Sequence, residues 1–195
     1  LKNDDNEYLI HSMNFSIENV LIEDVWEDRK KVFVVLFDTK TAFSYLAQNV
    51  TKSKWNHISI SFEETLSELF SFDYSANGFR EETLSVFKRG TEYLVYFTEV
   101  PEKSIKEMRK KISEIKNDPS QSYSLVTMLK AGINRYNRAG YFTATFDNDK
   151  MVCSTFVQSI LSTAGVVFYS DNRVMSPSDF LKKRKLTFFK KGVVK

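Results

Sequence analysis

The chain has 195 residues, of which 42% are hydrophobic and 14% aromatic, and its net charge is +3. This length and composition suffice to bury the core of one ordinary globular domain, and only 6 glycines and 3 prolines argue against long disordered linkers. The single cysteine excludes an intrachain disulfide, and with two histidines it falls short of a four-ligand Cys/His zinc site. We therefore expect one domain without a metal or another cofactor.

Partners and location are constrained by what the sequence lacks. No run of about 18 apolar residues exists, so we expect no transmembrane helix. The first residues are polar and acidic, unlike a signal peptide, which favours the cytoplasm; the chain begins with Leu1, as a processed or excised segment would. The basic segment 182–191, KKRKLTFFKK, could resemble a nucleic-acid patch, but the small net charge favours a basic edge strand. We expect no nucleic-acid partner, and the sequence leaves the oligomeric state open.

The first third of the chain predicts a strand and a helix. Residues 1–30 are expected to form an N-terminal lead-in, and the mixed pattern at 15–25 could add a strand with a turn. The near-continuous apolar run at 31–38 indicates a central strand. The spacing within 38–50 then predicts a helix with Thr41 as its N-cap.

Two alternating segments follow and predict a β-hairpin. In 55–62, Ile58 and Ile60 share one face, while His57 and two serines share the other, which is typical of a half-buried strand. Residues 68–73 alternate again. Because only a short turn separates the two runs, we expect them to be neighbouring antiparallel strands.

The rest of the chain predicts another strand pair, several helices and a last strand. Residues 83–89 and 91–100 bracket Gly90 and have the pattern of paired strands. The later predicted elements are amphipathic helices at 101–116 and 123–133, a helix at 153–164 ended by Gly165, a short helix at 176–183 and a strand at 185–191. Together they indicate a single α+β domain over 31–195 with a mainly antiparallel sheet.

Cys153 begins the apolar stripe of the predicted helix at 153–164. A lone cysteine at such a position is more commonly a small buried hydrophobe than a nucleophile. However, a helix N-terminus presents unpaired N–H groups and a positive dipole end, which stabilise a thiolate and a developing oxyanion. The position therefore suits both interpretations.

His57 offers the base that a catalytic thiol requires. The base itself needs a polar group that orients it. By strand parity, Ser71 and Asp73 lie on the same side of the predicted hairpin as His57, whereas Glu68 does not. If the helix of Cys153 packs across that polar side of the sheet, the three groups converge. The other interpretation of His57 is an ordinary half-exposed strand histidine.

The order of these segments resembles the circularly permuted NlpC/P60-like proteins of bacteria. The resemblance covers about residues 32–180 and depends on four features: an apolar strand followed by a helix, the strands NHISISF and ELFSFD, the helix start MVCSTFV and the downstream SPSDF. It implies a papain-like fold in which the strand histidine precedes the helix cysteine, with the nucleophile helix packed against the sheet.

The resemblance implies a thiol-dependent hydrolase or acyltransferase. Cys153 matches the nucleophile and His57 matches the base, with Ser71 and Asp73 as candidates for the third residue. Such an enzyme cleaves an amide, peptide, thioester or ester bond through a covalent acyl-enzyme, so the expected partner is a peptide or acyl-bearing substrate. The alternative is a catalytically inactive papain-like domain that binds a partner without turnover.

Overall fold

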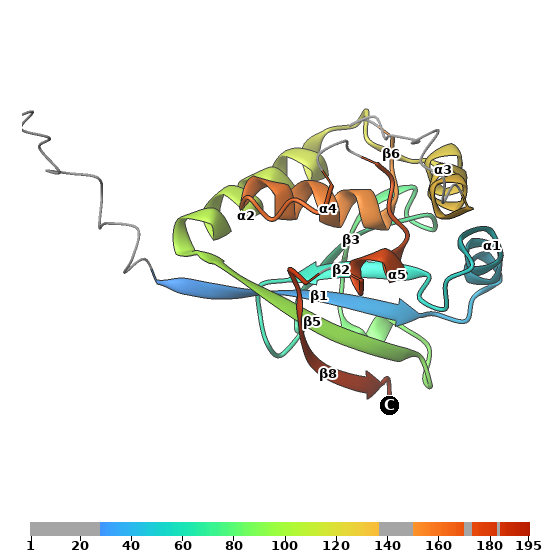
Figure 1. Cartoon of the computed structure of the whole chain (residues 1–195), viewed down its shortest axis with the longest axis horizontal. Helices are drawn as coiled ribbons and strands as arrows, with labels where there is room; N and C mark the ends of the chain where they lie inside the picture. The colour runs from blue at the N-terminus through green and yellow to red at the C-terminus, as the bar shows by residue number, and fades with distance from the viewer. Residues whose placement is uncertain (1–27, 137–149, 170–172, 183) are drawn as a thin grey trace, which may run out of the picture.

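A long central strand, β1 (Arg29–Asp38), organises the protein. We describe it from a computed structural model, which describes residues 28–136, 150–169, 173–182 and 184–195; the predicted strand at 15–25 lies outside these ranges. Within them the main sheet has six strands in the order β4-β3-β2-β1-β5-β8, and every neighbouring pair is antiparallel (Figure 1). The other strands are β2 (His57–Ser61), β3 (Leu69–Asp73), β4 (Gly78–Glu82), β5 (Glu92–Pro101) and β8 (Thr187–Val193).

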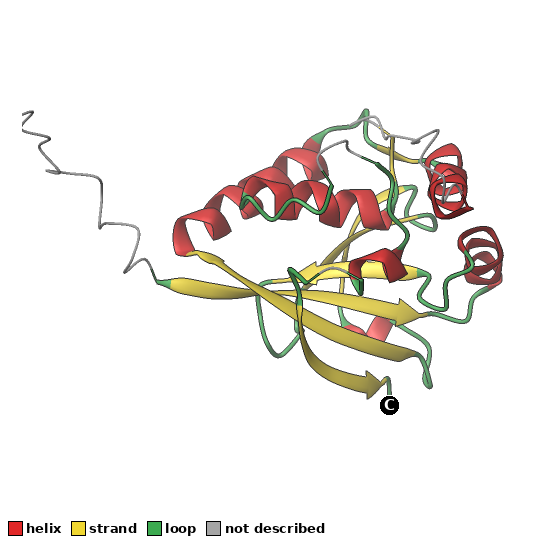
Figure 2. Cartoon of the chain, viewed as in Figure 1, coloured by secondary structure: helices red, strands yellow, loops and turns green. Residues whose placement is uncertain are grey.

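Helices α2 (Glu102–Asn117) and α4 (Cys153–Thr163) lie together on one face of this sheet (Figure 2). The apolar residues of the alternating strands point to that face, where Ile58, Ile60 and Phe72 join Met108 and Phe156 in the main core. Burial of these large side chains is the dominant favourable contribution to folding. The α4 helix is buried on all sides over Cys153–Gln158, which fixes the position of its first turn.

The opposite face of the sheet has its own smaller core. Phe33, Val35 and Phe37 of β1 pack there against Leu66 and Leu69, and Phe87 from the segment after β4 covers them. A short 3-10 helix, η2 (Leu84–Val86), belongs to that segment. Both faces of β1 and β2 are therefore shielded from solvent.

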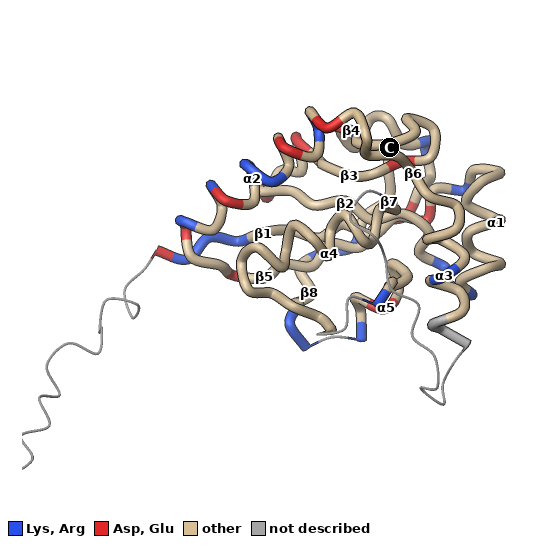
Figure 3. The backbone as a smooth tube through the Cα atoms, turned by 90° about the horizontal axis from the view of Figure 1, so that it is seen from above, with Lys and Arg blue, Asp and Glu red and all other residues tan. Residues whose placement is uncertain are grey.

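Two further helices pack against each other beyond one end of the sheet (Figure 3). These are α1 (Ala42–Thr51) and α3 (Leu125–Tyr136). Thr41 caps α1 by accepting a hydrogen bond from the Ser44 amide, as predicted. The remaining elements are α5 (Pro177–Phe180) and the parallel pair β6 (Ser122–Tyr123) and β7 (Lys150–Met151).

The structure confirms the α+β class, the mainly antiparallel sheet and the packing of the Cys153 helix against β2 and β3. The prediction of a strand at 83–89 is wrong. A turn with Asn77 at φ +51° reverses the chain after β3, so the strand that pairs with β3 is β4. Leu84 and Phe87 then pack on the smaller core at a spacing of three residues, which suits a helical turn rather than an alternating strand.

The surroundings of β2 also differ from the prediction. We expected the side of His57 and its two serines to be half-exposed, yet every residue of β2 is buried because the smaller core covers that side. We also considered an α4 helix that crosses this polar side. It packs instead on the apolar side with Ile58 and Ile60, because its own stripe is apolar.

Candidate active site

Cys153 is the first residue of α4, at the end of the sheet where β2 begins. Its side chain is 6% exposed and faces a pocket. The residue before it, Val152, occupies the N-cap position, and its side chain gives the helix no capping hydrogen bond. The amide groups of the first turn thus keep the hydrogen-bonding capacity that a serine or aspartate cap would take up. Such a turn can donate to an anion or to an oxyanion.

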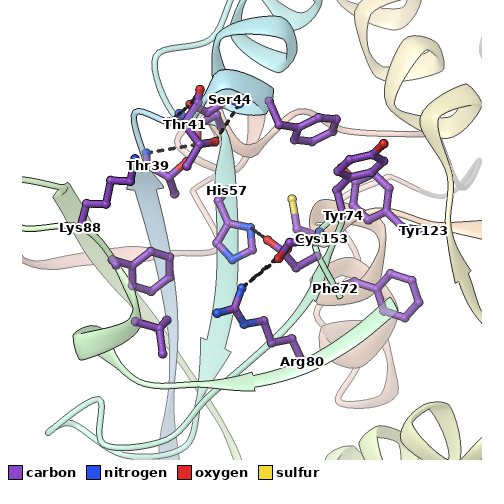
Figure 4. A pocket seen from close by; sticks show the side chains of 16 residues that line it. Thr39, Thr41, Ser44, His57, Phe72, Tyr74, Arg80, Lys88, Tyr123 and Cys153 are labelled. Carbon is purple, nitrogen blue, oxygen red and sulfur yellow. Dashed lines mark hydrogen bonds and ion pairs between the residues drawn. The ribbon is translucent and has the colours of Figure 1, made fainter. Parts of the chain in front are cut away.

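His57 is the first residue of β2, and its side chain lines the same pocket as Cys153. Figure 4 shows the sulfur of Cys153 on the side of the pocket next to the imidazole ring. The two side chains line one pocket although α4 covers the opposite face of the sheet, because each stands at the start of its element. Phe37 and Phe87 flank the imidazole, each with a ring centroid 5.9 Å from that of the histidine. These contacts fix the ring.

Glu82, the last residue of β4, holds the other side of the imidazole. Its Oε1 lies 3.0 Å from Nε2 of His57, and the Ser59 hydroxyl donates to the same oxygen at 2.6 Å. Both ionisable side chains are buried, so their interaction is little screened by solvent. Since Nε2 is occupied by Glu82, the nitrogen left for the thiol of Cys153 is Nδ1. Histidine and glutamate thus form a buried hydrogen-bonded pair in the pocket that Cys153 also lines.

The two residues that we expected to orient the imidazole lie near it, but neither makes a hydrogen bond to the ring among the described residues. Asp73 lies on the Nδ1 side, with its Oδ2 4.0 Å from that nitrogen. Ser71 is fully buried near Glu82, but its hydroxyl lacks a hydrogen-bond partner of normal geometry among the described residues. That Ser71 or Asp73 orients the imidazole stays a prediction, and Glu82 is a further candidate because it lies at hydrogen-bond distance from Nε2. The alternation along the strand predicted that both residues share a face of the sheet with His57. It could not show which strand supplies the side chain that contacts Nε2.

Arg80 connects the two carboxylates that flank His57. Its Nη1 lies 3.7 Å from Oδ1 of Asp73, and its Nε lies 3.7 Å from Oε2 of Glu82. The guanidinium also donates to the Ser75 hydroxyl at 3.2 Å. In Figure 4 this side chain extends beside the imidazole ring. Arg80 therefore offsets part of the negative charge around His57.

These charges shift the proton affinities of the site in a consistent direction. Burial alone would lower the pKa of His57, but the Glu82 carboxylate and the neighbouring Cys153 side chain raise that pKa well above its ordinary value. Burial would likewise raise the pKa of Glu82, yet the histidine and the Ser59 hydroxyl lower it. The pKa of Asp73 is lowered against its burial by Ser75 and by His57. The Glu82 carboxylate therefore stabilises the protonated form of the imidazole, which is the form that His57 takes when it accepts a proton.

A pocket of about 280 Å³ opens in front of the Cys153 and His57 side chains. Its wall includes Tyr74 and Tyr123 on one side and Arg80 on another (Figure 4). This volume is near the lower limit of about 300 Å³ for pockets that bind small molecules. The thiol is thus placed where a bound carbonyl could reach it.

We did not predict Glu82 as a site residue, because residues 79–82 were given no strand before the one wrongly predicted at 83–89. A usable signal was present. The turn at Asn77–Gly78 is followed by an alternation in which Phe79 faces the main core and Arg80 and Glu82 face the other side. A strand predicted to begin at Gly78 would have placed the carboxylate of Glu82 on the same face of the sheet as His57.

The chain matches no protein-family model, and a comparison with curated proteins found no match either. In the part of the chain that the structure describes, no cluster of three or more His, Cys, Asp or Glu side chains is arranged to hold a metal ion. Over the same residues, none of the helices combines the length and the apolar character needed to cross a membrane.

Proposed function

We propose that the protein is a thiol-dependent hydrolase or acyltransferase with a papain-like arrangement of Cys153, His57 and Glu82. The observation that carries the proposal is a thiol at the first turn of a helix, in one pocket with an imidazole whose Nε2 is held by a buried carboxylate. A nucleophile, a base and a group that orients the base are the three parts that covalent acyl transfer requires. A buried structural cysteine needs none of them.

The reaction follows from this geometry. His57 accepts the proton of the Cys153 thiol, and the sulfur attacks the carbonyl carbon of an amide, thioester or ester. The first-turn amides of α4 stabilise the oxyanion that forms. As the carbon–leaving group bond breaks, His57 returns the proton to the departing atom. Water, or another nucleophile, then releases the acyl group from Cys153, while Glu82 keeps the imidazole oriented and stabilises its charged form.

The order of the site residues supports a permuted NlpC/P60-like relationship. His57 on a strand precedes Cys153 on a helix, and that helix packs on the sheet that carries the histidine. This is the arrangement that the sequence resemblance implies. The orienting residue comes from the strand between them in the chain, and its position at Nε2 leaves Nδ1 for the thiol.

A test uses thioester turnover together with the mass of the intact protein. We expect the wild type to hydrolyse simple acyl thioesters and to accumulate an acyl adduct on Cys153. Cys153→Ala should abolish both, and His57→Ala should lower turnover by about 10²–10⁴-fold, the usual contribution of a general base. Ser162→Ala, on the exposed part of α4, is the matched control and should behave as the wild type.

The alternative of a non-catalytic binding domain makes the opposite prediction. If the wild type forms no adduct and turns over no thioester, ester or peptide faster than Cys153→Ala does, the arrangement of the three residues is structural. The proposal is then withdrawn.

A further inference from the structure

The pocket in front of Cys153 has an aromatic end. Phe43 of α1, Tyr74 after β3 and Tyr123 of β6 meet there, with the first two rings stacked at a centroid distance of 4.4 Å. Tyr123 packs edge-on against both, at 5.9 and 5.7 Å. Three separate elements thus supply one continuous apolar wall. Such a wall favours a flat or extended apolar group over a small polar one.

The other end of the pocket is cationic. Figure 4 shows Lys88 on the far side of His57 from Cys153, with Arg80 beside the imidazole. The charge of Arg80 is partly offset by Asp73 and Glu82, each at 3.7 Å. Lys88 is exposed, and among the described residues its ammonium has neither an ion pair nor a side-chain hydrogen bond. The positive charge that this end offers to a ligand therefore comes mainly from Lys88.

The proposed reaction decides which end receives which part of a substrate. The acyl carbon must bond to the sulfur of Cys153, so the acyl group extends toward the wall of Tyr74 and Tyr123 on that side. The leaving atom must lie near His57 to receive its proton. The leaving group therefore extends past the imidazole toward Lys88.

We infer that the pocket selects substrates in which an apolar acyl group is joined to a leaving group that carries a carboxylate, sulfonate or phosphate, with Lys88 as the residue that recognises the anion. This inference rests on the proposed thiol chemistry and adds its substrate class. In the step concerned, the bond from Cys153 to the acyl carbon forms, the bond to the leaving atom breaks, and the anionic leaving group departs with the proton of His57. The pocket volume limits the enclosed part of the substrate to a small molecule.

The experiment compares four thioesters that combine two acyl groups with two leaving groups. The acyl group is benzoyl or acetyl, and the leaving group is 2-mercaptoethanesulfonate or neutral 2-mercaptoethanol. Each enzymatic kcat/KM is divided by the rate of the same thioester with a free thiol, which removes differences in intrinsic reactivity. For the wild type we expect a higher normalised kcat/KM for benzoyl than for acetyl thioesters, and for the sulfonate than for the hydroxyl leaving group. The preference for the sulfonate should decrease as salt is added.

Variants test whether the benzoyl preference comes from the aromatic end of the pocket and the sulfonate preference from Lys88. Lys88→Gln should lower the sulfonate preference about threefold, the effect of an exposed ion pair, and Lys88→Glu should lower it further. Phe43→Ala and Tyr74→Ala should lower the benzoyl preference about tenfold and leave the sulfonate preference in place. Arg89→Gln, next in the chain but outside the pocket lining, is the control and should change neither preference.

Each outcome bears on one claim. Turnover of all four thioesters without a preference, or a sulfonate preference that survives Lys88→Glu, overturns the substrate class while the thiol chemistry stands. If no thioester acylates Cys153 in the wild type, the proposed function itself fails, and the substrate class falls with it.

Discussion

Glu82 reaches Nε2 of His57 across an intervening strand, with 3.0 Å between its Oε1 and that nitrogen. The two residues stand 25 positions apart in the chain, at the end of β4 and the start of β2, with β3 between them in the sheet. Ser71 on β3 is buried near this carboxylate and is small. A compact side chain at position 71 leaves space for Glu82 to lie over the sheet and contact the imidazole.

Replacing the carboxylate at Nε2 should cost more activity than replacing the one near Nδ1. Glu82→Gln is expected to lower thioester turnover by about 10²-fold or more, because the imidazole loses the charge that stabilises its protonated form. Asp73→Asn and Ser71→Ala should each retain turnover within about tenfold of the wild type, since neither residue contacts Nε2. Steady-state kinetics on the three variants decide the matter. Equal losses in Glu82→Gln and Asp73→Asn would show that Glu82 has no special role.

The same ion pair should make stability depend on pH. The raised pKa of His57 adds stability that is complete below about pH 6.5 and is lost as the pH rises through the folded-state pKa. The lowered pKa of Glu82 adds stability that is complete above about pH 4.5 and is lost as the pH falls through its folded-state pKa. The contribution of the pair is therefore largest between these two values.

Urea unfolding of the wild type and Glu82→Gln from pH 5 to 9 measures this contribution. We expect Glu82→Gln to lower the free energy of unfolding by about 3 kcal/mol near pH 6, because it leaves a buried charge without its partner. The difference should shrink as the pH rises. Glu92→Gln removes an exposed carboxylate that pairs with Lys54 and Lys191, and it should show a small difference with little change over this range. A difference for Glu82→Gln that grows with pH would contradict the assignment.

The sequence allowed the central part of the fold and two residues of the site to be predicted. The alternation around Ile58 and Ile60 indicates a strand with His57 on its other face, and the apolar stripe from Cys153 indicates a helix that starts there. Both signals are local, because each depends on side chains within one element. They persist in the structure for the same reason.

Such local patterns could not predict that Glu82 contacts Nε2 of His57. Glu82 contacts His57 only because the turn at Asn77 folds β4 back beside β3, which sets a register across two strand pairs. The burial of Ser59 is equally non-local, since Phe87 from a later segment helps cover that face of the sheet. Alternation predicts which residues share a face, but it says neither whether that face is covered nor which strand becomes the next neighbour.

The contact between α1 and α3 gives a test of the fold that is independent of the site. A Cβ atom at Gly132 would lie 2.8 Å from both the Cγ1 and the carbonyl oxygen of Val50. Gly132→Ala should therefore destabilise the protein by about 1–3 kcal/mol through overpacking, although alanine is the better helix former. Thermal or urea unfolding measures the change. Val126→Ala, exposed on the same helix, is the control and should stay within about 0.5 kcal/mol of the wild type. Stabilisation by Gly132→Ala would contradict the close approach of the two helices.

The most direct test of the central claim is the rate at which iodoacetamide alkylates Cys153 at pH 6 relative to pH 9. The chain has one cysteine, so intact mass reports on it alone. The ratio of the two rates cancels restricted access to the pocket. In the unfolded chain that ratio should be small, because an unperturbed thiol is only about 0.3% ionised at pH 6.

In the folded protein the imidazolium of His57 should keep the pH 6 rate high, so we predict a ratio at least about tenfold above that of the chain unfolded in denaturant. His57→Ala should remove most of this advantage, and Glu82→Gln should reduce it, whereas Asp73→Asn should leave most of it in place. A folded-state ratio equal to the unfolded one, and unchanged by His57→Ala, would contradict the account and identify Cys153 as a packing residue.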